Sequence, residues 1–486
     1  MRILFVISEA FFSENLGVMT LSAICKRDGH STKLLVLSKH DILKTLEQYD
    51  PDMIGYSAMT PDIPAFKRAD AIVRNWITRR NKPVPRIMGG AHPTFFPEVC
   101  DEMQLDAIVV GEGDNAMVRL LKAHEENEGF DGIPNVFPAG GSMEGVDLEL
   151  IDDLDEIPFL DRDVFYDAVP HFRNFRLRSV KIGRGCPYRC TYCHNHVFNA
   201  LFRKSGKIVR RRSVDSVMNE LKHVVTNCGP VGQIRFGDDT FIYKIDDWVR
   251  EFLRRYKEEI NLPFYCLLRS NVITDEMVEL LADAGCCSVS LSVESGREDV
   301  RNNILKRGIS DEKARQSFAT LRKYGIKTQT NSMLGLPGGT IEDDLLSFRF
   351  EKSLKPSVGQ FSIWTPFPRT KLTDIANDGG CIPDDYNFEN FLWSRSPLNS
   401  YSDKDKDIQL NLVHLGPLFC DLPEAFNPIL EKILRAKPNK VFHVLGTSYT
   451  LFKYYISIFF SSIPKNPFTM ARFLFGSLKY MVWSKE

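Results

Sequence analysis

Short apolar runs alternate with amphipathic segments in two separate blocks of this 486-residue chain. In the first block the runs are residues 3–7, 32–37, 53–57, 86–89 and 107–110. Strands this short and this apolar, separated by helical segments, are typical of a parallel sheet that is covered on both faces. We therefore expect an α/β protein that begins with a doubly wound, Rossmann-like domain over residues 1–135.

The second block continues the same rhythm with six further strands. Their apolar runs are residues 180–183, 233–236, 264–268, 288–293, 328–334 and 360–364. Helix start signals lie between them at Ser213, Thr274, Ser310 and Thr340. Six consecutive βα units predict a partial (β/α)6 barrel, which we place at residues 176–375. Residues 136–175 are then a linker, and residues 376–486 form a mainly helical region.

Three cysteines stand close together directly after the first strand of the second block, at Cys186, Cys190 and Cys193. Three thiolates on one short loop can hold a four-iron cluster by three irons and leave the fourth iron open to a small molecule. A disulfide loop is disfavoured, because the first residues lack a signal-peptide pattern and the other eight cysteines form no framework. A zinc site with His194 or His196 as the fourth ligand stays open.

The CxxxCxxC spacing of these cysteines resembles the signature of radical S-adenosylmethionine (SAM) enzymes. The resemblance implies that SAM binds the open iron and is cleaved to a 5'-deoxyadenosyl radical. It also implies contacts to SAM from the strand ends of the barrel. A carboxylate at Asp239 would suit the SAM ammonium, and a helix cap is the alternative that we favour less. The residues expected to bind SAM are Tyr192, Gly237, Asp238, Asp239, Glu294, Ser332, Met333 and Gly335.

The loops after the strands of the first block are rich in glycine, which permits a bulky ligand to approach the backbone. They resemble the cobalamin-binding domain that precedes the barrel in one branch of the radical SAM family. Each residue also has a structural interpretation, such as a tight turn at Gly89 or a packing role for His92. The residues expected to bind cobalamin are Gly17, Ser57, Thr60, Gly89, Gly90, His92, Gly111, Glu112 and Gly113.

One departure from that cobalamin-binding pattern concerns the cobalt ligand. Domains of this kind that supply a histidine carry D-x-H-x-x-G after the first strand, whereas this chain has residues 8–15 there without that motif. The later Asp28-Gly29-His30 has the wrong order. We therefore expect cobalamin without a histidine ligand from this motif. A dinucleotide site has little support, because no G-x-G-x-x-G follows the first strand.

The resemblance covers residues 1–375 and implies a cobalamin-dependent radical SAM enzyme that methylates an unactivated carbon. In that mechanism the radical removes a substrate hydrogen and methylcobalamin delivers the methyl group. Cyclisation or oxidative rearrangement with the same cofactors is an alternative, and an iron–sulfur redox sensor or electron carrier is an alternative of another class. Methylthiotransferases are less favoured, because only Cys25 and Cys100 precede the linker.

Charge and composition restrict the partners. A net charge of -1 argues against a nucleic-acid binder. We expect a small-molecule or lipid-like substrate, and a reductant such as flavodoxin or ferredoxin under anaerobic, cytoplasmic conditions. The basic run over residues 203–212 is either a solvated face or a guide for an anionic partner.

The last part of the chain is basic and aromatic. From Lys432 onward it carries nine Lys or Arg and one acidic residue, Glu486. No stretch reaches the roughly 18 apolar residues of a spanning helix. Helices of this composition either cover the open side of the barrel or lie on the inner face of a membrane. The second interpretation would fit a lipid-like substrate.

Overall fold

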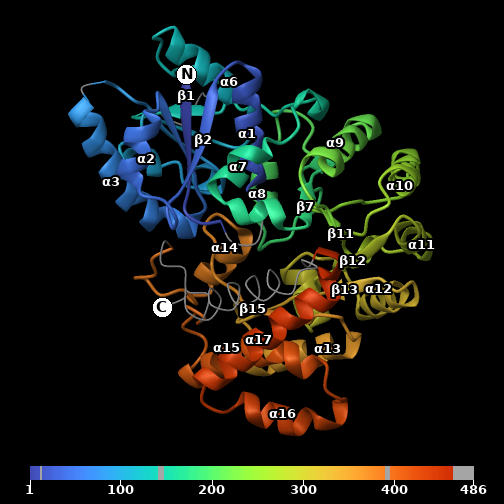
Figure 1. Cartoon of the computed structure of the whole chain (residues 1–486). Helices are drawn as coiled ribbons and strands as arrows, with labels where there is room; N and C mark the ends of the chain where they lie inside the picture. Colours follow the sequence, from blue (N-terminus) through green and yellow to red (C-terminus); the bar gives the residue numbers. More distant parts are fainter. Residues whose placement is uncertain (11–13, 81, 141–146, 389–394, 463–486) are drawn as a thin grey trace. The chain divides into compact units, whose positions relative to one another are not determined.

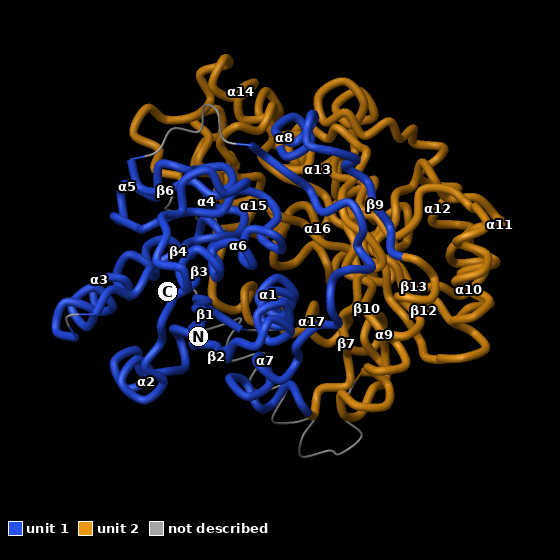
Figure 2. Tube along the Cα trace, turned by 90° about the horizontal axis from the view of Figure 1, so that it is seen from above, with its two compact units in different colours: residues 1–173, 198–212 blue, residues 174–197, 213–486 orange. Residues whose placement is uncertain are grey.

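The computed structural model describes residues 1–10, 14–80, 82–140, 147–388 and 395–462. The chain forms two compact units, which are coloured separately in Figure 2. The first unit contains residues 1–173 and 198–212, and the second contains residues 174–197 and 213–486. The described part of residues 136–173, where we expected a linker, thus belongs to the first unit. The chain enters this unit a second time just after the cysteine loop.

A six-stranded sheet forms the centre of the first unit. Its strands lie in the order β2 (Ser31–Val36), β1 (Arg2–Ile7), β3 (Met53–Ser57), β4 (Arg86–Gly89), β5 (Ala107–Val109) and β6 (Val136–Pro138). The first five strands are parallel, and β6 runs antiparallel to β5. The strand order reverses next to β1, as in a doubly wound sheet. The predicted fold class is confirmed for this unit.

Helices cover both faces of this sheet, which explains why its strands are apolar along most of their length. Helix α1 (Leu16–Arg27) packs against α6 (Asp114–Glu125), and α2 (Ile42–Tyr49) packs against α3 (Ile63–Arg80) on the opposite face (Figure 1). The shorter helices of the unit are α4 (Ala91–Phe95), α5 (Val99–Glu102) and α7 (Arg162–Ala168). The second part of α8 (His194–Leu201) and the short strand β9 (Arg210–Arg211) also belong to it.

The second unit contains a parallel sheet whose strands follow one another in sequence order. They are β7 (Leu177–Val180), β10 (Gln233–Phe236), β11 (Phe264–Leu267), β12 (Cys286–Ser290) and β13 (Lys327–Gln329). After a short break, β14 (Ser332–Leu334) pairs in parallel with β15 (Phe361–Ile363). Single bridges from Glu294 to Ser332 and from Gln329 to Val358 continue the sheet between these parts. Six strand positions in one continuous order form the predicted partial barrel.

Of the five longer helices between these strands, all except the second begin at a predicted start signal. They are α9 (Val214–Asn227), α10 (Asp247–Glu259), α11 (Asp275–Asp283), α12 (Asp311–Lys323) and α13 (Ile341–Leu354). Ser213, Thr274 and Ser310 each accept a hydrogen bond from the backbone N–H three residues later. Thr340 forms a capping box with Asp343. Each cap pairs a backbone N–H that would otherwise have no partner at the helix start.

The described remainder of the second unit, residues 371–388 and 395–462, is mainly helical, as predicted. It contains α14 (Lys371–Asp378), α15 (Asp403–Cys420), α16 (Asn427–Leu434) and α17 (Lys440–Lys453). Helix α15 is the centre of this region, because it packs against α13, β15, α16 and α17. In the described part of the chain, no helix has both the length and the apolar character to cross a membrane.

Candidate active site

A cavity of about 180 Å³ in the second unit is lined by all three cysteines of the motif. The cysteines lie on the loop between the short strand β8 (Gly183–Arg184) and α8. Cys186 and Cys190 are buried, and Cys193 is partly exposed. Gly185 turns the chain into this loop with a φ of +89°, a conformation that favours glycine. The motif therefore forms one wall of the cavity.

Two neighbouring carboxylates at the end of β10 have different positions. Asp238 accepts hydrogen bonds from the backbone N–H groups of Ile182 (3.1 Å) and Gly183 (2.8 Å). Burial raises its pKa to about 7. Asp239 instead lines the cavity beside the cysteines. Asp238 thus fixes the start of the cysteine loop, and Asp239 is the carboxylate that can face a ligand. Gly237, just before them, donates its N–H to the carbonyl of Val180.

A hydrogen-bonded group of Glu294, Tyr192 and Arg307 forms another wall of the cavity. The hydroxyl of Tyr192 donates to Glu294 at 3.0 Å and accepts from the Arg307 guanidinium at 2.8 Å. Arg307 and Glu294 also form an ion pair at 3.7 Å. Burial raises the pKa of Tyr192 well above its ordinary value, so its hydroxyl keeps its proton. Glu294 has a φ of +73°, an uncommon conformation for a residue with a side chain that is often found at functional sites.

Arg269, just after β11, reaches the cysteines directly. Its guanidinium donates to the Cys190 sulfur at 3.1 Å and to the carbonyl of Arg307 at 2.7 Å. The structure places Arg269 among the residues that line the cavity. Arg307 itself was not predicted, because no motif marks it. It lies 115 residues beyond its partner Tyr192, and only the fold brings the two side chains together.

The donor set of the cavity fits an iron–sulfur cluster. Burial raises the pKa of Cys186, and it raises the pKa of Cys193 to about 11. Both groups must therefore lose a proton to become metal ligands. Among the described residues, no three His, Cys, Asp or Glu side chains are placed to share a single metal ion. A cluster does not require such a group, because each thiolate binds a different iron.

The histidines considered as zinc ligands have other contacts. Nδ1 of His196 lies 2.5 Å from the carbonyl of Cys193, and its Nε2 accepts from the backbone N–H of Lys371 at 3.2 Å. A neutral imidazole that donates from Nδ1 and accepts at Nε2 has no lone pair left for a metal. His194 packs edge-to-face against Phe367, and burial lowers its pKa to about 4. The geometry therefore favours a cluster over zinc.

The three predicted SAM residues of the fifth strand position have different surroundings. Ser332 is buried and donates to the carboxyl group of Glu351. Met333 lines a second cavity. Gly335 has a φ of +69°, and its N–H donates to the buried carboxyl group of Asp344 at 3.0 Å. The glycine turn that follows β14 is therefore held by α13.

Helix α15 holds the same turn from a second direction. Gln409 of this helix donates to the Asp344 carboxyl group at 2.8 Å. Burial raises the pKa of Asp344 to about 7, while its hydrogen bonds with Gln409 and the Gly335 N–H act in the opposite direction. One carboxyl group thus links the turn to two helices, which fixes the backbone of the turn.

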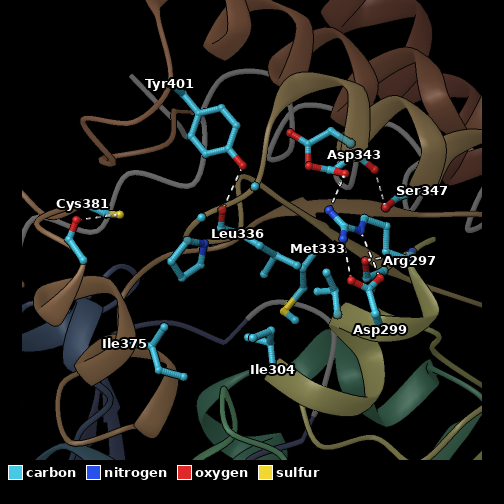
Figure 3. Close-up of a pocket in the computed structure, with 17 residues that line it drawn as sticks. Arg297, Asp299, Ile304, Met333, Leu336, Asp343, Ser347, Ile375, Cys381 and Tyr401 are labelled. Atoms are coloured by element: carbon cyan, nitrogen blue, oxygen red, sulfur yellow. Dashed lines mark hydrogen bonds and ion pairs between the residues drawn. The ribbon is translucent and has the colours of Figure 1, made fainter.

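The second cavity has a volume of about 460 Å³ and lies beside this turn (Figure 3). Met333, Leu336, Ile304 and Ile375 contribute apolar side chains to it. On its polar side, Arg297 pairs with Asp299 and Asp343, and the hydroxyl of Tyr401 donates to the carbonyl of Leu336 at 2.9 Å. An apolar pocket with a few polar groups suits a planar ring that carries polar substituents.

In the first unit, several predicted cobalamin residues lie at the carboxyl ends of β3 and β4. His92 is buried, its Nδ1 is 3.2 Å from the Thr60 hydroxyl, and its ring stacks on Phe96. Gly90 has a φ of +105°, and a side chain there would meet the backbone of Ala58 at 2.7 Å. The predicted pair Ser57 and Gly89 are partners across β3 and β4, and Gly17 lies in the first turn of α1.

The Gly111–Gly113 loop after β5 makes contacts within the first unit. Glu112 pairs with the buried guanidinium of Arg210 at 2.6 Å and also accepts from the backbone N–H of Ile151. A side chain at Gly111 would overlap the ring of Phe202. Arg210 belongs to the basic run that we interpreted as a solvated face or a guide for an anionic partner. That interpretation is wrong for Arg210, which is 5% exposed.

Family models match both units of the chain. The radical SAM superfamily model matches residues 180–349, and the B12 binding domain model matches residues 4–121. The chain belongs to the radical SAM enzymes that carry a B12-binding domain. The cofactors of such an enzyme are a 4Fe–4S cluster, SAM and cobalamin, as predicted. The membership favours the enzyme over a redox sensor or an electron carrier.

Curated relatives and a solved structure extend this result. An uncharacterized methyltransferase of Pyrococcus horikoshii is 28% identical over 74% of this chain and 78% of its own length. An anaerobic magnesium-protoporphyrin IX monomethyl ester cyclase of Rubrivivax gelatinosus is 23% identical over 77% of this chain and 68% of its own. The methyltransferase TsrM of Kitasatospora setae was solved with cobalamin and a 4Fe–4S cluster. It matches this chain with a TM-score of 0.64 at 16% identity, and the match covers 89% of this chain and 98% of the TsrM chain. The chain shares its fold with that enzyme.

Proposed function

We propose that this enzyme transfers a methyl group to an unactivated carbon of a small-molecule substrate. The observation that carries the proposal is the convergence of the three cysteines with Asp239, Glu294 and Tyr192 on one cavity. The B12-binding domain and the relationship to a methyltransferase support methyl transfer over the alternatives.

Each wall of the cavity has a separate task in this proposal. Cys186, Cys190 and Cys193 hold the cluster, which supplies the electron for reductive cleavage of SAM. Asp239 faces the SAM ammonium as a charge-assisted partner. Glu294 is fixed by hydrogen bonding and charge from its two neighbours, so its carboxylate is oriented before a ligand arrives. Preorganised polar groups bind a charged ligand without first having to be ordered.

The adenosyl end of SAM is assigned to the neighbourhood of Met333 and Gly335. The second cavity offers an apolar surface there, and Gly338 of the same turn lines it with open space beside its backbone. Asp344 and Gln409 hold this turn in place. Ser332 has a supporting role in this proposal, because its hydroxyl is directed to Glu351 and it lines neither cavity.

Cobalamin is assigned to the carboxyl edge of the first sheet. Gly90 has a left-handed backbone and Ser57 has a small side chain at this edge, whereas the left-handed Gly111 is covered by the ring of Phe202. Gly113 stands at the start of α6, and Glu112 supports the loop through its ion pair. The cobalt receives no histidine from a D-x-H-x-x-G motif in this proposal. A reductant protein such as flavodoxin or ferredoxin supplies electrons.

The test starts with anaerobic purification from cells supplied with hydroxocobalamin. We expect about four irons and one cobalt per chain, because one cluster and one corrinoid are bound. Iron without cobalt would contradict methyl transfer from cobalamin. SAM cleavage is then followed with candidate substrates, and the product mass decides the reaction. A gain of one methyl group supports the proposal, whereas a loss of hydrogens or a gain of oxygen indicates cyclisation or oxidative rearrangement.

We also propose that helix α17 contacts a membrane surface. Its exposed apolar side chains include Val441, Leu445 and Phe452, whose spacing places them close to one line along the helix. Val441 is 70% exposed and Phe452 is 57% exposed. The chain from Lys432 onward is strongly basic. Such a helix can insert its apolar side at the headgroup level of anionic lipids. Residues 463–486 of the predicted membrane-associating region lie outside the described residues.

Vesicle sedimentation tests this contact. We expect binding to vesicles with anionic phosphatidylglycerol and weaker binding to neutral phosphatidylcholine vesicles. Phe452→Ser together with Val441→Ser should reduce the bound fraction several-fold. Leu43→Ser, at an exposed apolar residue of α2, is the matched control and should leave it unchanged. Equal binding by the double variant and the unmodified chain would contradict the proposed contact.

A further inference from the structure

Arg269 is a buried charged side chain that reaches a cysteine of the motif. It is 6% exposed and follows β11, on a different element from the cysteine loop. One guanidinium nitrogen donates to the Cys190 sulfur at 3.1 Å, and another donates to the carbonyl of Arg307 at 2.7 Å. A guanidinium with two separate acceptors has a defined orientation. The hydrogen bond to sulfur is therefore built into the site.

Three further contacts fix this orientation. The guanidinium lies over the ring of Tyr188, with its carbon 3.7 Å from the ring centroid. Its Nε donates to the side chain of Asn271 at 3.2 Å. Asn271 in turn donates to the hydroxyl of Tyr188, at 3.4 Å. Within the described residues, no carboxylate lies at ion-pair distance from Arg269. Its buried positive charge is thus directed to the cysteine sulfur.

We propose that Arg269 positions Cys190 and raises the reduction potential of the cluster. The inference rests on the proposed role of the three cysteines. Reduction by the reductant protein adds one electron to the cluster, and no bond has to break in this step. A positive N–H group beside a ligating sulfur stabilises that added negative charge, because hydrogen bonds and nearby charge both influence cluster potentials. Arg269 therefore makes the reduced form easier to reach.

Arg307 offers a matched control in the same cavity. It carries the same charge and is 7% exposed. Its guanidinium donates to the Tyr192 hydroxyl and to the carbonyl of Ser292, and it pairs with Glu294. No hydrogen bond from Arg307 to a cysteine sulfur is present among the described residues. A comparison of Arg269→Gln with Arg307→Gln thus separates the sulfur hydrogen bond from the general loss of positive charge.

The experiment is a potentiometric titration of the reconstituted full chain without SAM, followed by EPR of the reduced cluster. At a fixed potential, Arg269→Gln should lower the ratio of reduced to oxidised cluster at least tenfold, which corresponds to about 59 mV. Arg269→Lys keeps the charge but cannot reach both acceptors. It should therefore lower the ratio of reduced to oxidised cluster by more than threefold but by less than Arg269→Gln does. Arg307→Gln should change the ratio less than threefold.

Two results would overturn the inference. The first is a ratio for Arg269→Gln within threefold of the unmodified chain. The second is a change in Arg307→Gln as large as that in Arg269→Gln. Should Arg269→Gln retain no cluster, Arg269→Lys decides, and a change below threefold in that variant overturns the inference. Failure of the unmodified chain to hold four irons is a different outcome, because it contradicts the proposed function itself.

Discussion

The proposed sites of the two units are formed by different kinds of contact. In the second unit, side chains of the sequence motifs converge on a cavity that is lined by Cys186, Cys190 and Glu294. In the first unit, Glu112 of the Gly111–Gly113 loop pairs with Arg210, and an aromatic ring packs on Gly111. A metal cluster needs particular side-chain donors, whereas a large corrin ring needs open backbone. In the first unit, the side chains of Arg210 and Phe202 therefore support the Gly111–Gly113 loop.

The largest effect should come from the cysteines of the second unit. Cys190→Ala removes one of three cluster ligands, so we expect nearly complete loss of bound iron and of SAM cleavage. Cys228→Ala, at a half-buried cysteine outside the cavity in the same unit, is the control. Iron analysis and the 5'-deoxyadenosine yield are the measurements. Full iron content in Cys190→Ala would contradict the assignment of the cluster.

A smaller effect is expected from the buried ion pair of the first unit. Arg210→Met removes the buried guanidinium that pairs with the Glu112 carboxylate, whose side chain is 11% exposed, and this should cost about 3–5 kcal/mol of unfolding free energy. Arg119→Met breaks the more exposed pair with Glu149 and should cost about 1 kcal/mol or less. Urea unfolding of both variants measures the difference. Equal costs would show that Arg210 is not a structural support of this loop.

Gly111 tests the packing of the same loop. An alanine there would meet the ring of Phe202 and would require a left-handed backbone at φ +78°, so we expect a loss of about 2–4 kcal/mol. Gly132→Ala is the matched control, since its φ is +74° and nothing lies within 4 Å of the added carbon. It should lose only about 1 kcal/mol. Urea unfolding measures both losses, and similar values would show that backbone conformation, rather than Phe202, requires glycine at position 111.

Local signals in the sequence were sufficient to predict the βα order of both units, because apolar runs and helix caps depend on neighbouring residues. The cysteine loop was predictable for the same reason, since ligand spacing is local. Contacts between distant segments were not predictable in this way. Arg307 reaches Tyr192, and Arg210 reaches Glu112, only after the chain has folded. Ser332 illustrates a second limit, because strand register decides which side chain faces a cavity and which faces a neighbouring helix.

The smallest expected effect concerns buried carboxyl groups, whose raised pKa values distinguish the second unit from the first. The carboxyl groups whose pKa rises to about 7 or 8 belong to the second unit in the described chain, at Asp238, Asp344 and Glu351. Burial raises the pKa of Glu351 from 4.5 to about 8. The folded chain therefore keeps a proton there that the unfolded chain releases above about pH 4.5. Folding stability from this group is greatest at low pH and is lost as the pH rises from 4.5 to 8.

Glu351→Gln should remove this dependence, because glutamine resembles the protonated acid and does not titrate. Between about pH 5 and 8 the unmodified chain should lose up to about 1.4 kcal/mol per pH unit relative to the variant. The pKa of Glu259 is lowered to about 2 by hydrogen bonds from Arg255 and Lys222, so this group is ionised in the folded chain over that range. Glu259→Gln is therefore the control with a nearly unchanged slope. Urea unfolding at several pH values measures the slopes. Parallel curves for Glu351→Gln and the unmodified chain would show that Glu351 is already ionised at about pH 5. In that case the burial of Glu351 does not set the pH dependence of the second unit.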